Sequence, residues 1–321
     1  MNRVPRIVVV GSLVSDLVLW VPRLPRRHET LLATAHASHA GGKGLCQAVS
    51  ARRCGADVAM VGRVGTDDFG LDLLGLLDRE GVDRSAVSRD EIGTSLGIPL
   101  IDPNGNNAII GVPRANARVT VADVEQASEA IAAADVLLLQ MEVPLDACHA
   151  AVTIAEEAKT SVVWNPAPAE WGVDEFLPQE ISPFVSWLTP NEIEASELSS
   201  VEVSDHASAL RAANCLNEQR PGIGVVVTLG GAGAVVRPPA GRALQIKGHE
   251  VDAVDTTGAG DAFNGAFATA LAERLDLAKA LEFATAAGAL ATTVVGAAAG
   301  LPLRSAIQAQ LHSSKIRAEL I

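Results

Sequence analysis

Short apolar runs alternate with helical patterns along most of the chain, and this alternation restricts the fold more than any other feature. Continuous apolar runs of this length are typical of strands in a parallel sheet that is covered on both faces. The runs are Ile7–Gly11, Val58–Gly62, Val136–Gln140, Ser161–Trp164, Val185–Thr189 and Val225–Leu229. Helical spacing of apolar residues predicts helices between them at Gly44–Arg53, Leu71–Glu80, Val121–Ala133, Leu145–Ala158 and His206–Glu218. The sequence therefore predicts a layered α/β fold.

Two segments, Val14–Ala40 and Thr94–Val112, interrupt the alternation because neither has a helical period. The second contains Asp102-Pro103-Asn104-Gly105, a turn sequence that is typical of a hairpin. We therefore expect strands and hairpins in these two segments.

The composition restricts the class of partner. A chain of 321 residues with 48% hydrophobic content can bury a large core, in one domain or two. The net charge of −13 argues against a nucleic-acid partner, which would require a basic patch.

The N-terminal sequence and the cysteines favour a soluble cytoplasmic protein. The apolar run Ile7–Val10 soon meets Ser12 and Asp16, so it lacks the layout of a signal peptide. No apolar stretch reaches about 20 residues without charge or glycine, so no membrane span is expected. Cysteines at positions 46, 54, 148 and 215 lack metal-ligand spacing, and a cytosolic enzyme would keep them reduced.

A glycine turn, Asp255-Thr256-Thr257-Gly258-Ala259-Gly260-Asp261, precedes a helical pattern that begins near Phe263. Such a turn directs free N–H groups at whatever lies in front of it, and the helix dipole favours negative charge there. Gly258 and Gly260 would let a ligand approach the main chain. Asp261 is well placed to take a proton from a hydroxyl that attacks a phosphate, although it could equally serve only to cap the helix.

A second glycine motif, Gly41-Gly42-Lys43-Gly44, opens the helical segment that ends near Gly55. The P-loop pattern is absent from it, so by itself it fits a flexible hinge as well as a ligand site. Further short motifs follow the same order as these two: Gly11-Ser12-Leu13-Val14-Ser15-Asp16, Gly65-Thr66-Asp67-Asp68-Phe69-Gly70, Asn165-Pro166-Ala167-Pro168 and Thr189-Pro190-Asn191-Glu192-Ile193-Glu194. In order and spacing the chain resembles the ribokinase-like (phosphofructokinase-B type) family of carbohydrate and nucleoside kinases, from about Ile7 to about Pro302.

The resemblance implies a three-layer fold with a mainly parallel central sheet flanked by helices, plus a small β-sheet lid over the substrate site. Residues 14–40 and 94–112 would form the lid, with Gly41 and Gly42 at its hinge. Residues 1–13, 41–93 and 113–321 would form the α/β nucleotide-binding and catalytic domain. Many relatives pair their lids, which implies a homodimer here.

The resemblance also implies the chemistry, namely ATP-dependent phosphorylation of a sugar hydroxyl. Asp261 would be the base, and the N–H groups of Gly258, Ala259 and Gly260 would be the anion hole. Asn191 and Glu194 would organise Mg²⁺ and the phosphates, although they also fit a helix cap with its capping box. Further ATP contacts would come from Thr228, Gly230, Gly233 and Thr285. A potassium-like ion would lie at Asp255, Thr257, Ala291, Val294, Gly296 and Gly300; relatives often have serine at the last position.

The substrate residues match ribokinases only in part. Asp16 would be the main sugar anchor because a carboxylate accepts two hydroxyl hydrogens. The resemblance places Glu142 near the sugar, and Gly41, Gly42 and Lys43 are further candidate substrate residues. Lys43 and Arg114 could attract an acidic or phosphorylated group, or could simply face ATP or solvent. Val14 and Cys46 replace asparagines of ribokinases and cannot make their hydrogen bonds.

Two alternatives to a sugar kinase stay open on the sequence. An adenosine-like nucleoside kinase of the same fold would need an apolar wall to stack the base, and Val14, Trp20 and Cys46 allow one. A sugar sensor without turnover would tolerate the changed substrate positions, although the intact Asp261 argues against it.

Overall fold

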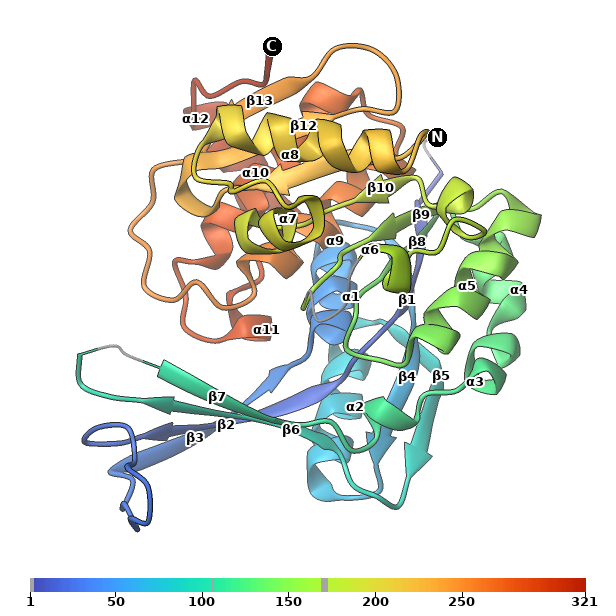
Figure 1. Cartoon of the computed structure of the whole chain (residues 1–321). Coiled ribbons are helices and arrows are strands. Elements are labelled where there is room, and N and C mark those ends of the chain that lie inside the picture. Colours follow the sequence, from blue (N-terminus) through green and yellow to red (C-terminus); the bar gives the residue numbers. More distant parts are fainter. Residues whose placement is uncertain (1–2, 105–106, 169–172) are drawn as a thin grey trace.

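A computed structural model describes residues 3–104, 107–168 and 173–321, whose helices and strands form three layers with a smaller sheet projecting from one end (Figure 1). The central sheet has 10 strands within these residues, in the order β14-β13-β12-β11-β10-β9-β8-β1-β4-β5. The strands are β1 (Arg6–Val10), β4 (Asp57–Gly65), β5 (Asp83–Asp90), β8 (Val136–Leu139), β9 (Ser161–Trp164), β10 (Trp187–Leu188), β11 (Gly224–Thr228), β12 (Gly233–Arg237), β13 (Leu244–Lys247) and β14 (Glu319–Leu320). From β11 to β5 neighbouring strands are parallel, and β12, β13 and β14 extend the edge with antiparallel pairs.

Helices cover both faces of this sheet. One face carries α1 (Lys43–Arg53), α2 (Asp68–Glu80), α9 (Ala259–Ala272), α10 (Leu277–Ala291), α11 (Ala297–Gly300) and α12 (Arg304–Ser313). The other carries α3 (Val121–Gln126), α4 (Ser128–Ala133), α5 (Leu145–Ala158), α6 (Val173–Phe176), α7 (Glu192–Ser199) and α8 (His206–Gln219). Short 3₁₀ turns lie at η1 (Asn116–Arg118), η2 (Ser182–Phe184) and η3 (Gly230–Ala232).

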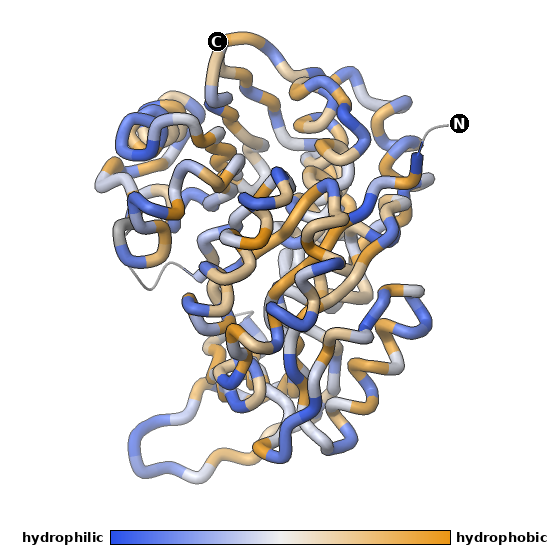
Figure 2. The backbone as a smooth tube through the Cα atoms, turned by 90° about the vertical axis from the view of Figure 1, so that its right-hand side faces the viewer, coloured by the Kyte–Doolittle hydropathy of each residue, from blue (hydrophilic) through white to orange (hydrophobic). Residues whose placement is uncertain are grey.

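The core lies between the sheet and each helix layer. Side chains alternate along β1, so that Ile7 and Val9 pack in one layer while Val8 and Val10 pack in the other. A strand that must be buried on both faces has to be apolar throughout, which explains the continuous runs in the sequence. In Figure 2 the covering helices alternate between blue and orange along the tube, as expected for helices with one apolar side.

The expected α/β layering is confirmed, with two differences in detail. The helix expected over Val121–Ala133 is two helices, because a tighter 3₁₀-type bond from the Ala127 N–H to the Val124 carbonyl interrupts the helical ladder. The strand expected over Val185–Thr189 is reduced to β10, because the 3₁₀ turn η2 occupies the residues directly before Val185.

The two segments without helical period form the small sheet, in the order β3-β2-β6-β7. Its strands are β2 (Val14–Trp20), β3 (Ala35–Gly41), β6 (Ser95–Ile101) and β7 (Asn107–Val112). The β2–β3 and β6–β7 pairs are antiparallel, and β2–β6 is parallel. The turn expected at Asp102-Pro103-Asn104-Gly105 lies between β6 and β7, and its last residue is outside the described residues.

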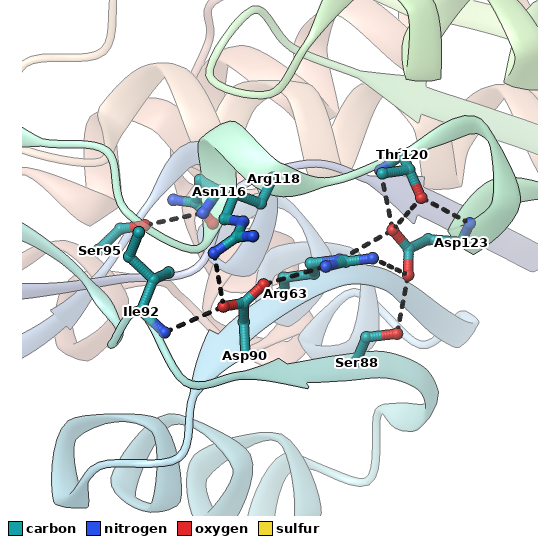
Figure 3. A network of polar contacts seen from close by, with 9 residues as sticks. All are labelled: Arg63, Ser88, Asp90, Ile92, Ser95, Asn116, Arg118, Thr120 and Asp123. Atoms are coloured by element: carbon teal, nitrogen blue, oxygen red, sulfur yellow. Dashed lines mark hydrogen bonds and ion pairs between the residues drawn. The ribbon is translucent and has the colours of Figure 1, made fainter.

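Polar contacts fix the base of the small sheet. Arg63 on β4 binds Asp123 of α3 through Nε and Nη2 (2.9 and 3.1 Å) and Asp90 of β5 through Nη1 (3.1 Å) (Figure 3). Asn116, in the chain that returns from β7, bonds both the N–H and the carbonyl of Leu13 at 3.1 Å. The Arg63 contacts join β4, β5 and α3, and the Asn116 bonds hold Leu13, directly before β2 leaves the central sheet.

Within the described part of the chain, no helix is both long enough and apolar enough to span a membrane.

Candidate active site

The glycine turn forms the start of α9. Gly258 precedes the helix with φ 81°, a left-handed conformation that favours glycine. No side chain caps the helix, and the Ala259 N–H is bonded within the turn to the Thr256 carbonyl (3.2 Å). Among the described residues, the N–H groups of Gly258 and Gly260 have no hydrogen-bond partner. The turn therefore offers at least two free donors to an anion.

Gly260 has open space beside it. A Cβ at this position would meet no atom within 4 Å, and its backbone is not left-handed. Neither packing nor conformation therefore requires glycine in this turn of helix. Glycine does keep clear the space next to the free N–H groups.

Asp261 is the third residue of α9 and faces a cavity. Its Oδ1 accepts a hydrogen bond from Gln47 Nε2 (3.0 Å), and its carboxylate does not cap the helix within the described residues. Burial raises the pKa of Asp261 to about 7, against the lowering effects of Lys43 and of the Gln47 hydrogen bond. Glu142 and Glu194 raise this pKa further. A carboxyl group with a pKa near neutrality is suited to general-base catalysis.

The cavity in front of Asp261 has a volume of about 760 Å³ and lies between the small sheet and the glycine turn that opens α9. Residues of the small sheet and of the α/β layers line it. The expected site residues in its wall are Val14, Asp16, Gly42, Lys43, Cys46, Glu142, Thr257, Gly258 and Asp261. Positions expected to bind substrate and to act in catalysis, far apart in the sequence, therefore face one space.

Asp16 is enclosed by backbone. A Cβ on Gly41 or on Gly97 would lie 2.1 Å from one of its carboxylate oxygens, so both neighbours have to be glycine. Burial raises the pKa of Asp16 to about 6, with a further increase from Glu142 and a decrease from His39. The carboxylate is thus held in place and is charged above this pH.

Glu142 and Lys43 form a charged group at the start of α1. The Lys43 N–H donates to Glu142 Oε2 (3.0 Å), which also accepts from the Ser12 hydroxyl. Burial lowers the pKa of Lys43, but the carboxylates of Asp261, Glu142 and Glu194 offset this effect, and the pKa is raised overall. Lys43 is therefore a cation surrounded by the acids of the site.

One wall of the cavity is apolar. Val14 and Asp16 lie on the same face of β2, and Cys46 lies on the first turns of α1. Burial raises the pKa of Cys46 well above its ordinary value, so the side chain is a neutral thiol. Arg114 is not in the cavity wall, because its guanidinium approaches the Thr94 carbonyl (3.5 Å) and the Asp67 carboxylate.

The sequence pattern of the pfkB family of carbohydrate kinases matches residues 4–304. The chain belongs to this family. It is 37% identical over 300 residues to a ribokinase of Haemophilus influenzae, covering 93% of this chain and 95% of the relative. A Bacillus subtilis ribokinase is 37% identical over 306 residues, covering 94% and 98%. A structure of Arabidopsis thaliana ribokinase with ribose and ATP superposes with a TM-score of 0.87 at 30% identity, covering 97% of this chain and 100% of that one.

In this pfkB kinase the expected phosphate-site residues lie next to each other. Asn191 Oδ1 accepts from the N–H groups of Ile193 and Glu194 (both 2.9 Å), and Glu194 Oε2 accepts from the Asn191 N–H (3.0 Å). The helix cap considered from the sequence is therefore formed. Asn191 also forms a parallel β-bridge with Thr228, which brings α7 beside the hairpin of β11 and β12.

The hairpin at which ATP contacts are expected is formed, with η3 between β11 and β12. Gly230 (φ 49°) and Gly233 (φ 106°) both have left-handed backbones, and a Cβ on Gly233 would lie 2.1 Å from the Ile246 carbonyl. Thr285 is buried on α10, where its hydroxyl donates to the Leu281 carbonyl (2.8 Å). The glycines are thus explained by the fold, and the Thr285 hydroxyl is already used.

The positions expected for a monovalent cation are connected in space. They are Asp255, Thr257, Ala291, Val294, Gly296 and Gly300. Asp255 accepts from the N–H groups of Thr257 (2.9 Å) and Gly296 (2.8 Å). A Cβ on Gly300 would lie 2.7 Å from the Ala291 carbonyl and 3.1 Å from that of Val294. Asp255 is the one carboxylate among these positions, Thr257 adds a hydroxyl, and the others offer carbonyl oxygens. In the described residues no cluster of three or more His, Cys, Asp or Glu could hold a metal ion.

The sequence did not single out Gln47, Asn116 or Ser95, although all three are buried at the site. Asn116 and Ser95 line the cavity, and Gln47 contacts Asp261. The available signal was a polar residue on the apolar side of a predicted helix, as with Gln47 next to Ala48 and Val49.

Proposed function

We propose that this enzyme transfers a phosphoryl group from ATP to a hydroxyl of a sugar or sugar-like substrate, with Asp261 as the general base. The observation that carries the proposal is the position of Asp261 at the start of α9, facing the cavity beside free N–H groups. These N–H groups, at Gly258 and Gly260, bind the transferring phosphoryl group, and Ala259 contributes to the same turn. The relationship to ribokinases, including one solved with ribose and ATP, supports this reaction.

The sugar lies between the small sheet and Asp261. Asp16 anchors the sugar by accepting hydrogen bonds from its hydroxyl groups, and Glu142 is the second carboxylate near the sugar. Gly41 leaves room for the Asp16 carboxylate, and Gly42 lines the cavity. Lys43 attracts the phosphates, since its ammonium is kept charged by the carboxylates of Asp261, Glu142 and Glu194.

ATP is held on the opposite side of Asp261. Thr228, Gly230 and Gly233 contact the nucleotide, and Thr285 adjoins it through its side chain's apolar part. Asn191 and Glu194 would organise Mg²⁺, which neutralises phosphate charge when it is bound. The linked positions from Asp255 to Gly300 would hold K⁺ or a similar ion, chiefly through carbonyl oxygens, beside the anion hole.

The small sheet acts as a lid, so that residues 14–40 and 94–112 form one body and residues 1–13, 41–93 and 113–321 form the catalytic domain. Gly42 (φ 92°), between β3 and α1, supports a hinge at Gly41-Gly42. Pairing of two lids would give a homodimer. The enzyme is proposed to act in the cytoplasm.

A substrate panel tests this proposal. ADP release and thermal shift are measured with ATP across pentoses, 2-deoxyribose, hexoses, their phosphates and nucleosides. A pentose or other sugar is expected to release ADP and to raise the melting temperature. Turnover only with nucleosides would favour the adenosine-like alternative, for which the apolar wall at Val14 and Cys46 could stack a base. Stabilisation by a sugar without turnover would favour a sensor.

The pH dependence of kcat/KM is expected to follow the two raised carboxylate pKa values. The base must be unprotonated, so kcat/KM falls as the pH decreases through about 7, the pKa of Asp261. The fall steepens below about 6, where Asp16 is protonated and accepts fewer hydrogens from the sugar. Initial rates between about pH 5 and pH 9 check this; a flat profile down to about pH 5 would contradict it.

Ribose is expected to be at best a poor substrate, because Val14 and Cys46 offer no amide to its hydroxyl groups. Each missing hydrogen bond weakens binding by roughly 0.5–1.5 kcal/mol, and more if a hydroxyl is buried unpaired. The double variant Val14→Asn with Cys46→Asn should therefore raise kcat/KM for ribose more than for the best sugar of the panel. KM for ATP serves as the control and should hardly change. Efficient phosphorylation of ribose by the unaltered enzyme would show that this interpretation of Val14 and Cys46 is wrong.

A further inference from the structure

We infer that Gln47 is a positioning residue whose side-chain amide holds the Asp261 carboxylate with an N–H donor turned toward it. The inference rests on the proposed role of Asp261 as the base. It concerns the buried side of Asp261, away from the substrate, where no residue has so far been given a part in the reaction.

Gln47 is fully buried on α1 and contacts two acceptors at once. Its Nε2 lies 3.0 Å from Asp261 Oδ1 and 3.1 Å from Asn165 Oδ1. A side-chain amide nitrogen carries two hydrogens, so both are used. The contact joins α1, which carries the substrate residues Lys43 and Cys46, to the proposed base on α9.

A backbone carbonyl sets the orientation of this amide. The Thr189 carbonyl can only accept, so Asn165 must direct Nδ2 to it (2.9 Å) and Oδ1 to Gln47. Gln47 then faces two acceptors, Asn165 Oδ1 and the Asp261 carboxylate, and only its nitrogen satisfies both. A reversed Gln47 amide would place three oxygens together. The orientation of the Gln47 amide, with Nε2 toward Asp261, is therefore set by Asn165 and does not have to be assumed from the Asp261 contact.

The same chain of contacts also holds the other side of the catalytic turn. The Thr189 hydroxyl donates to Asn264 Oδ1 (2.6 Å), and Asn264 Nδ2 donates to the Gly260 carbonyl (2.9 Å). The first turn of α9 is thus bonded at Gly260 and at Asp261 by one continuous set of buried polar groups. Such a closed set fixes both the anion hole and the base in one geometry.

The Gln140 side chain shows that the buried amides beside Asp261 are not the most stable choice for packing alone. Gln140 Nε2 donates to Gln47 Oε1 (2.7 Å), and this leaves Gln140 Oε1 buried without a hydrogen-bond partner. An unpartnered buried oxygen is unfavourable, and apolar side chains at both positions would avoid it. The donor that Gln47 presents to Asp261 explains why amides stand here.

The charges around Asp261 give the contact a measurable effect. Lys43 and the Gln47 hydrogen bond lower the pKa of Asp261, while burial, Glu142 and Glu194 raise it, and the Cys46 thiol beside it is neutral. Loss of the Gln47 donor removes one of the two lowering influences. The acid limb of kcat, which reports the bound complex, should then move to higher pH.

The test compares kcat against pH for Gln47→Leu and Gln47→Met, at saturating ATP and at saturating concentrations of the best sugar of the panel. Both are expected to move the acid limb upward by roughly 1 pH unit or more, since a hydrogen bond to a charged group has about this effect. KM for ATP should stay within about twofold, because no phosphate contact changes. Gln47→Met keeps the length of the side chain and also lacks a donor, so it carries the test if Gln47→Leu does not fold.

Gln140→Leu is the matched control. It removes an amide of the same size from the same buried cluster but no bond to Asp261, so its acid limb should stay within about 0.3 pH unit of the unaltered enzyme. An unmoved limb in the folded Gln47 variants, or an equal shift in Gln140→Leu, overturns the inference. If Asp261→Asn is inactive but the acid limb of the Gln47 variants is unmoved, Asp261 remains the base and only the role of Gln47 is contradicted. If Asp261→Asn turns over normally, the proposed role of Asp261 as the base is contradicted.

Discussion

Asp261→Asn is expected to lower kcat by at least about 10²–10⁴ while leaving ATP binding nearly intact. Asparagine has the same size as aspartate, and its Oδ1 can still accept the Gln47 hydrogen bond, but it cannot take a proton from the sugar hydroxyl. The free N–H groups of Gly258 and Gly260 are unchanged, so the phosphates keep their site. Steady-state ADP release gives kcat, and calorimetry gives the affinity for ATP.

The same variant should be more stable than the unaltered enzyme near pH 8. Burial raises the folded-state pKa of Asp261 from 3.8 to about 7, so the folded state disfavours its charged form. The stability associated with this group is present below about pH 4 and is lost as the pH rises through about 7. Asparagine has no charge to bury, so Tm at about pH 8 should rise and the gain should disappear near pH 4. Turnover close to that of the unaltered enzyme would remove Asp261 from the mechanism.

Gly260→Ala is expected to lower kcat by about 10²-fold or more without loss of stability. The new methyl group meets no atom of the chain within 4 Å, and alanine stabilises a helix relative to glycine by roughly 0.5–1 kcal/mol. The methyl group does occupy the space beside the free N–H groups, where the transferring phosphoryl group is proposed to lie. Steady-state rates and thermal unfolding, measured together, separate these two effects.

Gly75→Ala on α2 is the matched control for Gly260→Ala. It also replaces a helical glycine, and its Cβ would lie 3.3 Å from the flexible end of Arg79, well away from the cavity wall. Its melting temperature should rise by a similar amount while kcat stays unchanged. Unaltered kcat in Gly260→Ala, or an equal loss in Gly75→Ala, would argue against an anion hole at this turn.

The order of the layers could be predicted from the sequence because burial on both faces demands continuous apolar runs. Ile7–Gly11 and Ser161–Trp164 were found on that ground, as β1 and β9. Strand β5 could not be found in this way. Its sequence, Asp83–Asp90, is mostly polar. The strand is the last one of the sheet, so one of its edges has no neighbouring strand and is open to solvent.

The position of Arg114 could not be predicted from the sequence either. A cation near substrate motifs suggested an anion site, but the guanidinium approaches the Thr94 carbonyl outside the cavity wall. Arg114 has φ 30°, and the local turn after β7 directs its side chain. Turn geometry of this kind depends on contacts that the sequence pattern does not show.

The sequence by itself determined the α/β layers, the β-rich insertions and the glycine turn that ends in Asp261. Each of these depends on local properties: apolar period, absence of period, and the conformational freedom of glycine. Only the tertiary structure decided which groups meet, because Gln47 reaches Asp261 across 214 positions of sequence and Asn165 across 118. Burial raises the pKa of Asp261 to about 7 against the lowering effects of Lys43 and Gln47, which are distant in sequence, and no local pattern of residues carries that information.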